Sequence, residues 1–466
     1  MITTLLQSCI PSAMRIRLAI ACLALIVALA PNSLRADDRE TKPRPNILFL
    51  FTDDQRADTI HALGNATIRT PNLDRLVASG FTFRNAYCMG SDVPAVCLPS
   101  RTMLLSGRSL FHLKDRRRDA ATLPKSLGQF GYFTYHDGKS GNTPHDIQRD
   151  FIQNHYLDDL KDRTSGFPGK AIADAASEFL NRRKQEIPFF MYLAFANPHD
   201  PRVAAHEFRN AYDQRTMPLP ANFQPFHPFN NGELLVRDET LAPWPRSPDI
   251  VRKHLTDYYA VITGLDHEIG RILRALKTSG QYDNTIIIFS SDHGLALGSH
   301  GLFGKQSLYE HSMKAPLIIA GPGIPKGESD ALVYLHDLYP TICDLVGAAL
   351  PEGIDGRSLA PILRGEAQQV RDSIFLAYRN VQRAVRAGDW KLIRYPQIHK
   401  TQLFDLGHDP HEMHDLAGDS KYADKVRQLT ALLATSQAEH GDTQPLSVEK
   451  PEPAEVDLSF FEPKKP

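Results

Sequence analysis

The chain has 466 residues, of which 42% are hydrophobic and 23% charged, and its formal net charge at pH 7 is −1. This is a globular composition, and the length allows a substantial core in more than one lobe. The near-neutral charge argues against a nucleic-acid-binding protein or a polybasic membrane anchor, so any attraction for an anionic ligand must be local.

The first 36 residues (1–36) have the pattern of a secretory signal peptide. Arg15 and Arg17 precede an apolar run over 18–30, and small residues follow it. The run is shorter than the roughly 20 residues that a membrane-spanning helix needs, so we expect no stable membrane anchor. Cys22 within the run leaves a lipoprotein as the less favoured alternative. The sequence therefore predicts a periplasmic or secreted protein.

The next part of the chain alternates between predicted strands and helices. Continuous apolar runs suit strands that are covered on both faces. Such runs occur at 46–51, 187–195, 285–289 and 316–320, with a shorter one at 132–135. Helices with one apolar face are predicted over 71–80, 123–130, 171–184 and 249–280. This alternation predicts an α/β fold in which a large, mostly parallel sheet lies between layers of helices.

Past about residue 371 the pattern changes to short alternating runs at 373–378, 382–386 and 390–395, which predict an antiparallel sheet, and then to a helix over 423–439. We therefore expect a catalytic α/β domain at 45–370, a smaller C-terminal α+β subdomain at 371–445 and a tail at 446–466. The prolines and charges from residue 450 onward predict little order in that tail.

Polar residues follow the predicted strands. Asp53 and Asp54 come directly after the first one, and because adjacent carboxylates repel, a cation is the simplest way to hold both. A helix N-cap would explain one of them but not the pair. The other strand ends and a later glycine-containing loop contribute Lys139, His199, Asp292, His293 and Lys305.

Cys97 opens the segment 97–101, which reads CLPSR. Pro99 and Ser100 predict the start of a helix, so Arg101 is expected on the same side as Cys97. The backbone N–H groups of a helix start and a guanidinium together favour an anion. A lone cysteine is more often a buried, inert thiol, so only this context makes Cys97 a candidate nucleophile.

The carboxyl ends of parallel strands meet at one edge of a sheet, where ligands bind. The carboxylates expected there favour a hard divalent ion: calcium first, then magnesium or manganese, with zinc allowed by His293. The cationic groups favour an anionic ester, so the sequence predicts a hydrolase of sulfate or phosphate esters. A cysteine-based phosphatase is excluded, because Cys97 and Arg101 are too close in sequence for the loop of those enzymes.

The segment 217–248 is rich in proline and aromatic residues, and long loops of this kind often line sites. Its Trp244 is a candidate for stacking on a sugar ring, although packing within the loop is the more common use of such a side chain.

The segments 97–101 and 105–108 (LSGR) resemble the signature of the type I sulfatases, whose C-x-P-S-R cysteine is converted to formylglycine. The resemblance extends to TDD at 52–54, PH at 198–199, SDHG at 291–294, GK at 304–305, GRSL at 356–359 and LFDL at 403–406. It implies the alkaline-phosphatase-like fold, and a calcium ion held by Asp53, Asp54, the modified Cys97, Asp292 and His293.

By this resemblance, a hydrated aldehyde at residue 97 attacks sulfur, the alcohol leaves, and the second hydroxyl then expels sulfate. Arg101 and Lys139 would hold and polarise residue 97 and the sulfate, whereas His199 and Lys305 would bind sulfate and protonate the leaving oxygen. The implied partners are a sulfated sugar or oligosaccharide and a maturation enzyme, either formylglycine-generating or anaerobic.

One position departs from the family pattern. The family usually has a histidine two or three residues after the lysine of the motif at Lys139, and here Gly141 and Asn142 stand there. Either His145 or His136 takes that role, or the second half of the cycle is weakened. We expect substrate contacts at Asn142, His145 and Trp244.

The predicted function is that of a sulfuric ester hydrolase acting on a sulfated carbohydrate. One alternative is a phosphodiesterase or phosphonate-ester hydrolase on the same fold. The other is a sulfated-glycan-binding protein with weakened catalysis, which the missing histidine motivates.

Overall fold

The computed structural model describes residues 43–115, 121–141, 144–183 and 186–456. The expected signal peptide at 1–36 lies outside the described residues. From Arg44 onward the chain forms one compact unit. In the part of the chain that is described, no helix is long and apolar enough to cross a membrane.

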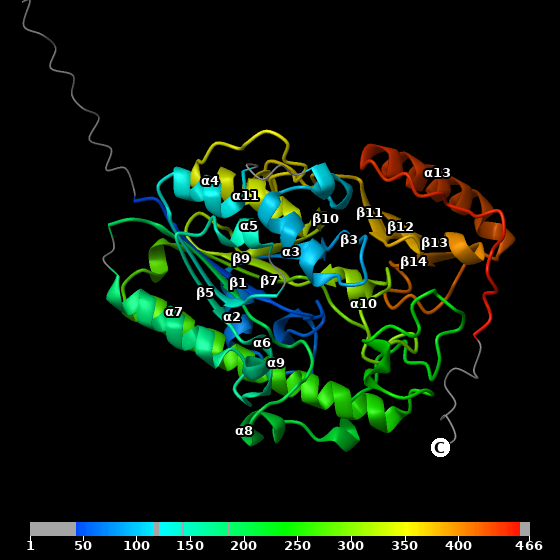
Figure 1. The fold of residues 1–466 in the computed structure, drawn as a ribbon, viewed down its shortest axis with the longest axis horizontal. Helices are drawn as coiled ribbons and strands as arrows, with labels where there is room; N and C mark the ends of the chain where they lie inside the picture. Colours follow the sequence, from blue (N-terminus) through cyan, green and yellow to red (C-terminus); the bar gives the residue numbers. More distant parts are fainter. Residues whose placement is uncertain (1–42, 116–120, 142–143, 184–185, 457–466) are drawn as a thin grey trace, which may run out of the picture. The chain divides into compact units, whose positions relative to one another are not determined.

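A large sheet organises this unit (Figure 1). Its strand order is β10 (Gly327–Tyr334), β2 (Phe81–Tyr87), β9 (Leu317–Ala320), β7 (Thr285–Ser291), β1 (Asn46–Thr52), β6 (Phe189–Ala194), β4 (Phe133–Lys139) and β5 (Gln153–Leu157), with β8 (Lys314–Ala315) beside β2. Strands from β7 through β5 pair in parallel, whereas β9 is antiparallel to both β7 and β2. The expected mostly parallel sheet is therefore confirmed, with the strand predicted at 316–320 running against its neighbours.

The side chains of β1 alternate between two cores, as the period of a strand requires. Ile47, Phe49 and Phe51 face the core that contains α3 (Cys97–Ser106), α4 (Leu123–Gln129) and α11 (Leu338–Val346). Leu48 and Leu50 face α2 (Pro71–Ser79), α7 (Lys170–Arg182) and α9 (Pro248–Thr278) on the other side. Figure 1 shows these two helical layers with the sheet between them. Each such side chain contributes about 1.5–3 kcal/mol by its burial, so β1 is firmly fixed.

The long helix α9 has clear start signals. Ser247 is its N-cap and accepts a hydrogen bond from the backbone N–H of Ile250, and Pro248 occupies the first turn, where its missing N–H costs nothing. The shorter helices are α5 (His145–Gln148), α6 (Asp159–Thr164), α8 (His206–Arg209), α10 (Glu310–Met313) and α12 (Ala360–Leu363).

A second sheet lies in the C-terminal part, in the order β14 (Lys400–Asp405), β13 (Trp390–Tyr395), β12 (Gln382–Ala387) and β11 (Ser373–Tyr378), followed in the chain by α13 (Ala423–Glu439). These four strands are antiparallel, which confirms the three predicted ones and adds β14 to them. The fifth strand, β3 (Gly90–Ser91), comes from just before Cys97 and pairs in parallel with β11. A Cβ at Gly90 would collide with the carbonyl oxygen of Ala377, so only glycine permits this close approach.

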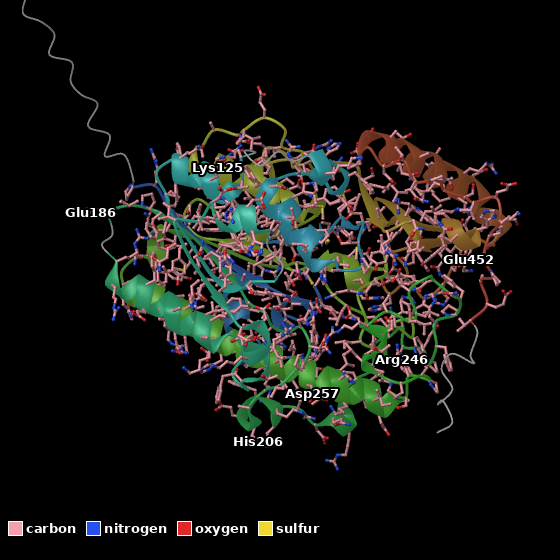
Figure 2. The ribbon with its side chains drawn as sticks, in the orientation of Figure 1. Lys125, Glu186, His206, Arg246, Asp257 and Glu452 are labelled. Carbon is pink, nitrogen blue, oxygen red and sulfur yellow. The ribbon has the colours of Figure 1, made fainter. Side chains whose placement is uncertain are left out.

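The described part of the tail is held by hydrogen bonds, so the prediction of little order is wrong for residues 450–456. The backbone N–H of Glu452, which Figure 2 labels, donates to Gln397 O at 2.8 Å, and the N–H of Asn230 donates to Ala454 O at 2.8 Å. Backbone groups of this segment find partners in neighbouring loops despite its polar composition.

Candidate active site

The ends of β1 and β7 bring the acidic residues together. These strands pair in parallel with Thr52 opposite Ser291, so the residues that follow them meet at one edge. The backbone N–H of Asp54 donates to Asp292 Oδ1 at 3.0 Å. Asp54 has a φ of 67°, in the left-handed region of the backbone that residues other than glycine rarely adopt. Backbone strain of this kind is typical of functional sites.

Cys97 lies against this edge at the start of α3. The helix begins at Cys97 itself, so the expected start at Pro99 and Ser100 is wrong by one half turn; proline is tolerated anywhere in the first turn. Cys97 Sγ lies 3.2 Å from His293 Nε2 and 3.3 Å from Lys305 Nζ. Burial, with the nearby charge of Asp53, raises the pKa of Cys97 well above its usual value, so the unmodified thiol is held protonated.

Four of the predicted metal ligands form one group. The ligand atoms of Asp54, Cys97, Asp292 and His293 all lie within 4.8 Å of one another, and all four residues are buried. Asp53 stands next to this group, and its buried Oδ1 has no hydrogen-bond partner among the described residues. Several carboxylate oxygens that converge in a buried site are the ligands that a hard divalent cation prefers, so the residue set fits the predicted ion.

Arg101 holds the two strand ends together. Its side chain is fully buried, and it donates from Nε to Asp292 Oδ2 at 3.1 Å and from Nη2 to Thr52 O at 3.1 Å. Despite burial, the charge of Asp292 raises its pKa, so it stays cationic. Its hydrogen bonds within the described residues go to the strand ends, and its expected contact with the modified residue 97 stays a prediction.

Two lysines neutralise the adjacent aspartates. Lys139 is the last residue of β4 and contacts the Asp53 carboxylate, whereas Lys305 Nζ donates to Asp54 Oδ1 at 2.8 Å. Burial acts to raise the pKa of both aspartates, but the charges of Lys139 on Asp53 and of Lys305 on Asp54, each with His199, hold these pKa values below the ordinary one. Both carboxylates are therefore ionised and ready to bind a cation.

His199 lies on the opposite side of Asp54, with Nε2 3.9 Å from Asp54 Oδ2. Its Nδ1 lies 2.8 Å from Arg163 Nη1 and 2.8 Å from Asp200 O. Its side chain is 13% exposed, whereas those of Lys305 and Asp54 are 5% and 3% exposed. His199 is thus the group of this cluster that faces an incoming molecule most openly.

Two of the three predicted substrate contacts, His145 and Trp244, lie among the described residues. His145 is exposed on α5, with Nδ1 3.2 Å from Gln148 Oε1. Trp244 stacks on Phe226, with ring centroids 5.7 Å apart, and the guanidinium of Arg246, a residue labelled in Figure 2, lies 3.5 Å from its ring centroid. Trp244 therefore packs within its own loop. Asn142 lies outside the described residues.

His136 is also unsuited to replace the missing histidine. It is fully buried in β4, and neither ring nitrogen has a hydrogen-bond partner among the described residues. Burial lowers its pKa to about 3, and the rings of Phe151, Tyr156 and Tyr192 lie around it. The ring is neutral at physiological pH and is not placed as a base.

The loop at 217–248 holds the glycine-containing loop that presents Lys305, through residues that the sequence did not single out. The carboxylate of Glu239 accepts the backbone N–H groups of Phe303 at 2.9 Å and Gly304 at 2.8 Å. Asp238 Oδ2 accepts from Gln306 Nε2 at 2.9 Å and lies 3.9 Å from Lys305 Nζ. The local pattern gave no signal for these residues beyond the unusual loop that carries them.

One sheet edge brings together a buried residue at a helix start, two ammonium groups, an imidazole and several carboxylates that could hold a cation. This arrangement is typical of a hydrolase of anionic esters. Residues 45–348 match the family model described as Sulfatase, and residues 298–439 match the model described as N-sulphoglucosamine sulphohydrolase, C-terminal. The chain belongs to the sulfatase family, in the alkaline-phosphatase-like superfamily, and is a sulfuric ester hydrolase.

Known proteins agree with this assignment. The N-acetylglucosamine-6-O-sulfatase of Bacteroides thetaiotaomicron is 29% identical over 90% of this chain and 91% of its own length, and the arylsulfatase of Clostridium perfringens is 27% identical over 84% and 94%. A solved structure, described as a complex with its substrate D-glucosamine-2-N,6-O-disulfate, superposes with a TM-score of 0.73 at 27% identity, covering 86% of this chain and 99% of that one. The phosphonate monoester hydrolase of Agrobacterium radiobacter, with a TM-score of 0.71 at 22% identity over 85% and 96%, shares the fold.

Proposed function

We propose that this enzyme removes sulfate from a sulfated carbohydrate, with Cys97 converted to formylglycine and a calcium ion bound beside it. The observation that carries the proposal is the convergence on residue 97 of His293 at 3.2 Å, Lys305 at 3.3 Å and Asp54 at 3.8 Å from Sγ. Residue 97 stands at the start of a helix and is surrounded by cationic groups and candidate metal ligands. A side chain in this position can contact an anionic ester.

The cation would be held by Asp53, Asp54, Asp292, His293 and the modified residue 97. The Oδ1 of Asp53, which accepts no hydrogen bond among the described residues, supports this ligand set. The oxygen-rich character of the set favours calcium, with magnesium or manganese as alternatives. When bound, such an ion supplies positive charge that polarises an ester oxygen and the group at residue 97. Arg101 keeps Asp292 in place for this purpose through its 3.1 Å hydrogen bond.

The remaining residues act on the sulfate and on the leaving alcohol. Lys139 and Lys305 bind sulfate oxygens and offset the charge that develops on them. His199 donates a proton from Nε2 to the leaving oxygen, since its Nδ1 is already engaged by Arg163 Nη1 and by Asp200 O, each at 2.8 Å, and Nε2 is the ring nitrogen left for the substrate. Asn142 and His145, on the segment after Lys139, stay predictions as substrate contacts.

The named relatives support a sulfated amino sugar as the substrate class. One is an N-acetylglucosamine-6-O-sulfatase, and the structural neighbour was solved with a glucosamine disulfate. We also infer that the chain is exported to the periplasm or the medium by the leader at 1–36, and that a formylglycine-generating or anaerobic maturation enzyme converts Cys97. The domain limits at 45–370 and 371–445 are part of the same proposal.

Intact mass and substrate turnover test this function together. The mature protein should show the mass decrease expected when an aldehyde replaces the thiol-bearing group, and it should release sulfate from a panel of sulfated glucosamines. Cys97→Ala should abolish turnover while it leaves folding intact. Faster hydrolysis of phosphate diesters than of every sulfate in the panel would establish the alternative hydrolase, and an unmodified cysteine without turnover would refute the enzyme mechanism.

A further inference from the structure

Arg237 joins the two carboxylates that flank His199 and Lys305. Its Nη1 donates to Asp200 Oδ1 at 2.9 Å and to Asp238 Oδ1 at 2.8 Å, and its Nη2 contacts the second oxygen of Asp200. Asp200 and Asp238 are each only 10% exposed, whereas Arg237 is 60% exposed. One surface cation thus bridges two buried acids that lie at the edge of the active site.

Each of these acids is coupled to a residue of the proposed chemistry. Asp200 follows His199 directly, and its Oδ1 lies 3.4 Å from the ring Nδ1. Asp238 Oδ2 lies 3.9 Å from Lys305 Nζ and also accepts from Gln306, the residue next to that lysine. Arg237 therefore makes no hydrogen bond to His199 or Lys305, but the carboxylate of Asp200 lies near His199 and that of Asp238 lies near Lys305.

The charge balance explains why the bridge matters. Lys305 Nζ is shared between Asp54 Oδ1 at 2.8 Å and Cys97 Sγ at 3.3 Å, and Asp238 is the next acid along. Without Arg237, the Asp238 carboxylate would lose the hydrogen bond from Nη1 at 2.8 Å and would draw Lys305 away from residue 97. The Asp200 carboxylate would likewise turn toward the imidazole of His199, which alters the direction of that ring.

We propose that Arg237 is a positioning residue of this enzyme, which fixes His199 through Asp200 and Lys305 through Asp238. This inference rests on the proposed function, since it assigns a role in the turnover that His199 and Lys305 carry. A bidentate guanidinium is suited to the task because it holds one carboxylate with two donors and still reaches a second.

The test is steady-state kinetics of Arg237→Met on a sulfated glucosamine, with rates divided by the fraction of chains converted at residue 97. Small misplacements of reacting groups cost up to about a hundredfold, so we expect kcat to fall by roughly tenfold to a hundredfold with little change in KM. Arg215→Met is the matched control, because Arg215 is 89% exposed and pairs with Asp213. It should retain the wild-type kcat.

Two further variants identify the path of the effect. Arg237→Lys keeps one charge but not the fork, so it should recover only part of kcat. Arg237→Met combined with Asp238→Asn removes the acid that competes for Lys305, so it should restore kcat above that of Arg237→Met alone.

Some outcomes would overturn the inference. The first is a kcat of Arg237→Met equal to that of the Arg215→Met control. The second is a rise in KM at unchanged kcat, which would mean that Arg237 binds the substrate directly. The third is a kcat of the double variant no higher than that of Arg237→Met. Failure of the wild-type enzyme to release sulfate would instead refute the proposed function, so the two failures are distinguishable.

Discussion

Lys305 Nζ lies 3.3 Å from Cys97 Sγ although the two residues are 208 positions apart in the chain. The loop that carries Lys305 is anchored by Glu239, and the helix that carries Cys97 is fixed by the hydrogen bond from Ser100 Oγ to Asp292 O at 2.7 Å. The two side chains therefore meet because separate contacts fix the loop of Lys305 and the helix of Cys97.

Lys305→Met should abolish most of the turnover. The substitution removes the ammonium beside residue 97, and loss of a single preorganised donor typically costs about a hundredfold or more in kcat. Sulfate release, normalised to the fraction converted at residue 97, measures the effect. Lys253→Met is the control, because Lys253 lies exposed on α9 and pairs with Asp257, which Figure 2 labels. A variant at Lys305 that keeps the wild-type kcat would contradict the proposed role.

Removal of divalent cations should lower both activity and thermal stability. A ligand that binds only the folded state stabilises it by mass action, so a chelator is expected to reduce the Tm and added calcium to restore it. Asp292→Asn weakens the same site, and its Tm should respond less to the chelator. Equal Tm values with and without chelator in the wild-type protein would argue against a resident cation at Asp54, Asp292 and His293.

Gly90→Ala should destabilise the protein and displace the start of α3. The new Cβ would collide with Ala377 O across the pairing of β3 and β11, and overpacking of this kind costs about 1–3 kcal/mol in addition to backbone strain. Gly64 is a matched control, because its φ of 112° is close to the 111° of Gly90 and a Cβ there meets nothing within 4 Å. Urea unfolding should give a larger loss for Gly90→Ala than for Gly64→Ala, and equal losses would show that the β3–β11 contact is unimportant.

The gathering of the proposed metal ligands and the cationic residues at one sheet edge was predictable, because each of these residues follows a local signal. Asp53, Asp54, Asp292 and His293 come just after continuous apolar runs, and the parallel register that brings those runs together follows from burial on both faces. Lys139 was expected just past the end of its strand, and it is instead the last residue of that strand, β4.

The supporting residues were not predictable, since their partners are distant in sequence. Glu239 accepts from Phe303, 64 positions away, and Arg163 reaches His199 from α6, 36 positions earlier in the chain. A composition rich in proline and aromatics indicated an unusual loop but not which of its side chains face the site. Trp244 was the conspicuous one, and it packs against Arg246 because an aromatic ring and a guanidinium stabilise each other when both are removed from water.

His136 should make the stability of the protein depend on pH. Burial lowers its pKa to about 3 in the folded state, whereas an unfolded histidine has a pKa of about 6.5. Between these values the unfolded chain binds more protons than the folded one, so stability is fully present above about pH 6.5 and is lost as the pH falls. Over the interval from pH 7 to pH 5 this residue alone should account for about 2 kcal/mol of lost stability.

Urea unfolding of His136→Phe at both pH values measures that contribution. Phenylalanine fits among the surrounding rings of Phe151 and Tyr192, and it cannot take up a proton, so the loss between pH 7 and pH 5 should shrink by about 2 kcal/mol relative to the wild type. Other buried histidines, such as His336 with a pKa lowered by burial to about 4, remain in both proteins and cancel in the comparison. His206→Phe, at an exposed position on α8 that Figure 2 labels, should leave the pH dependence unchanged. A His136→Phe variant with the same pH dependence as the His206→Phe control would mean that His136 is protonated, or paired with a hydrogen-bond partner, in the folded protein.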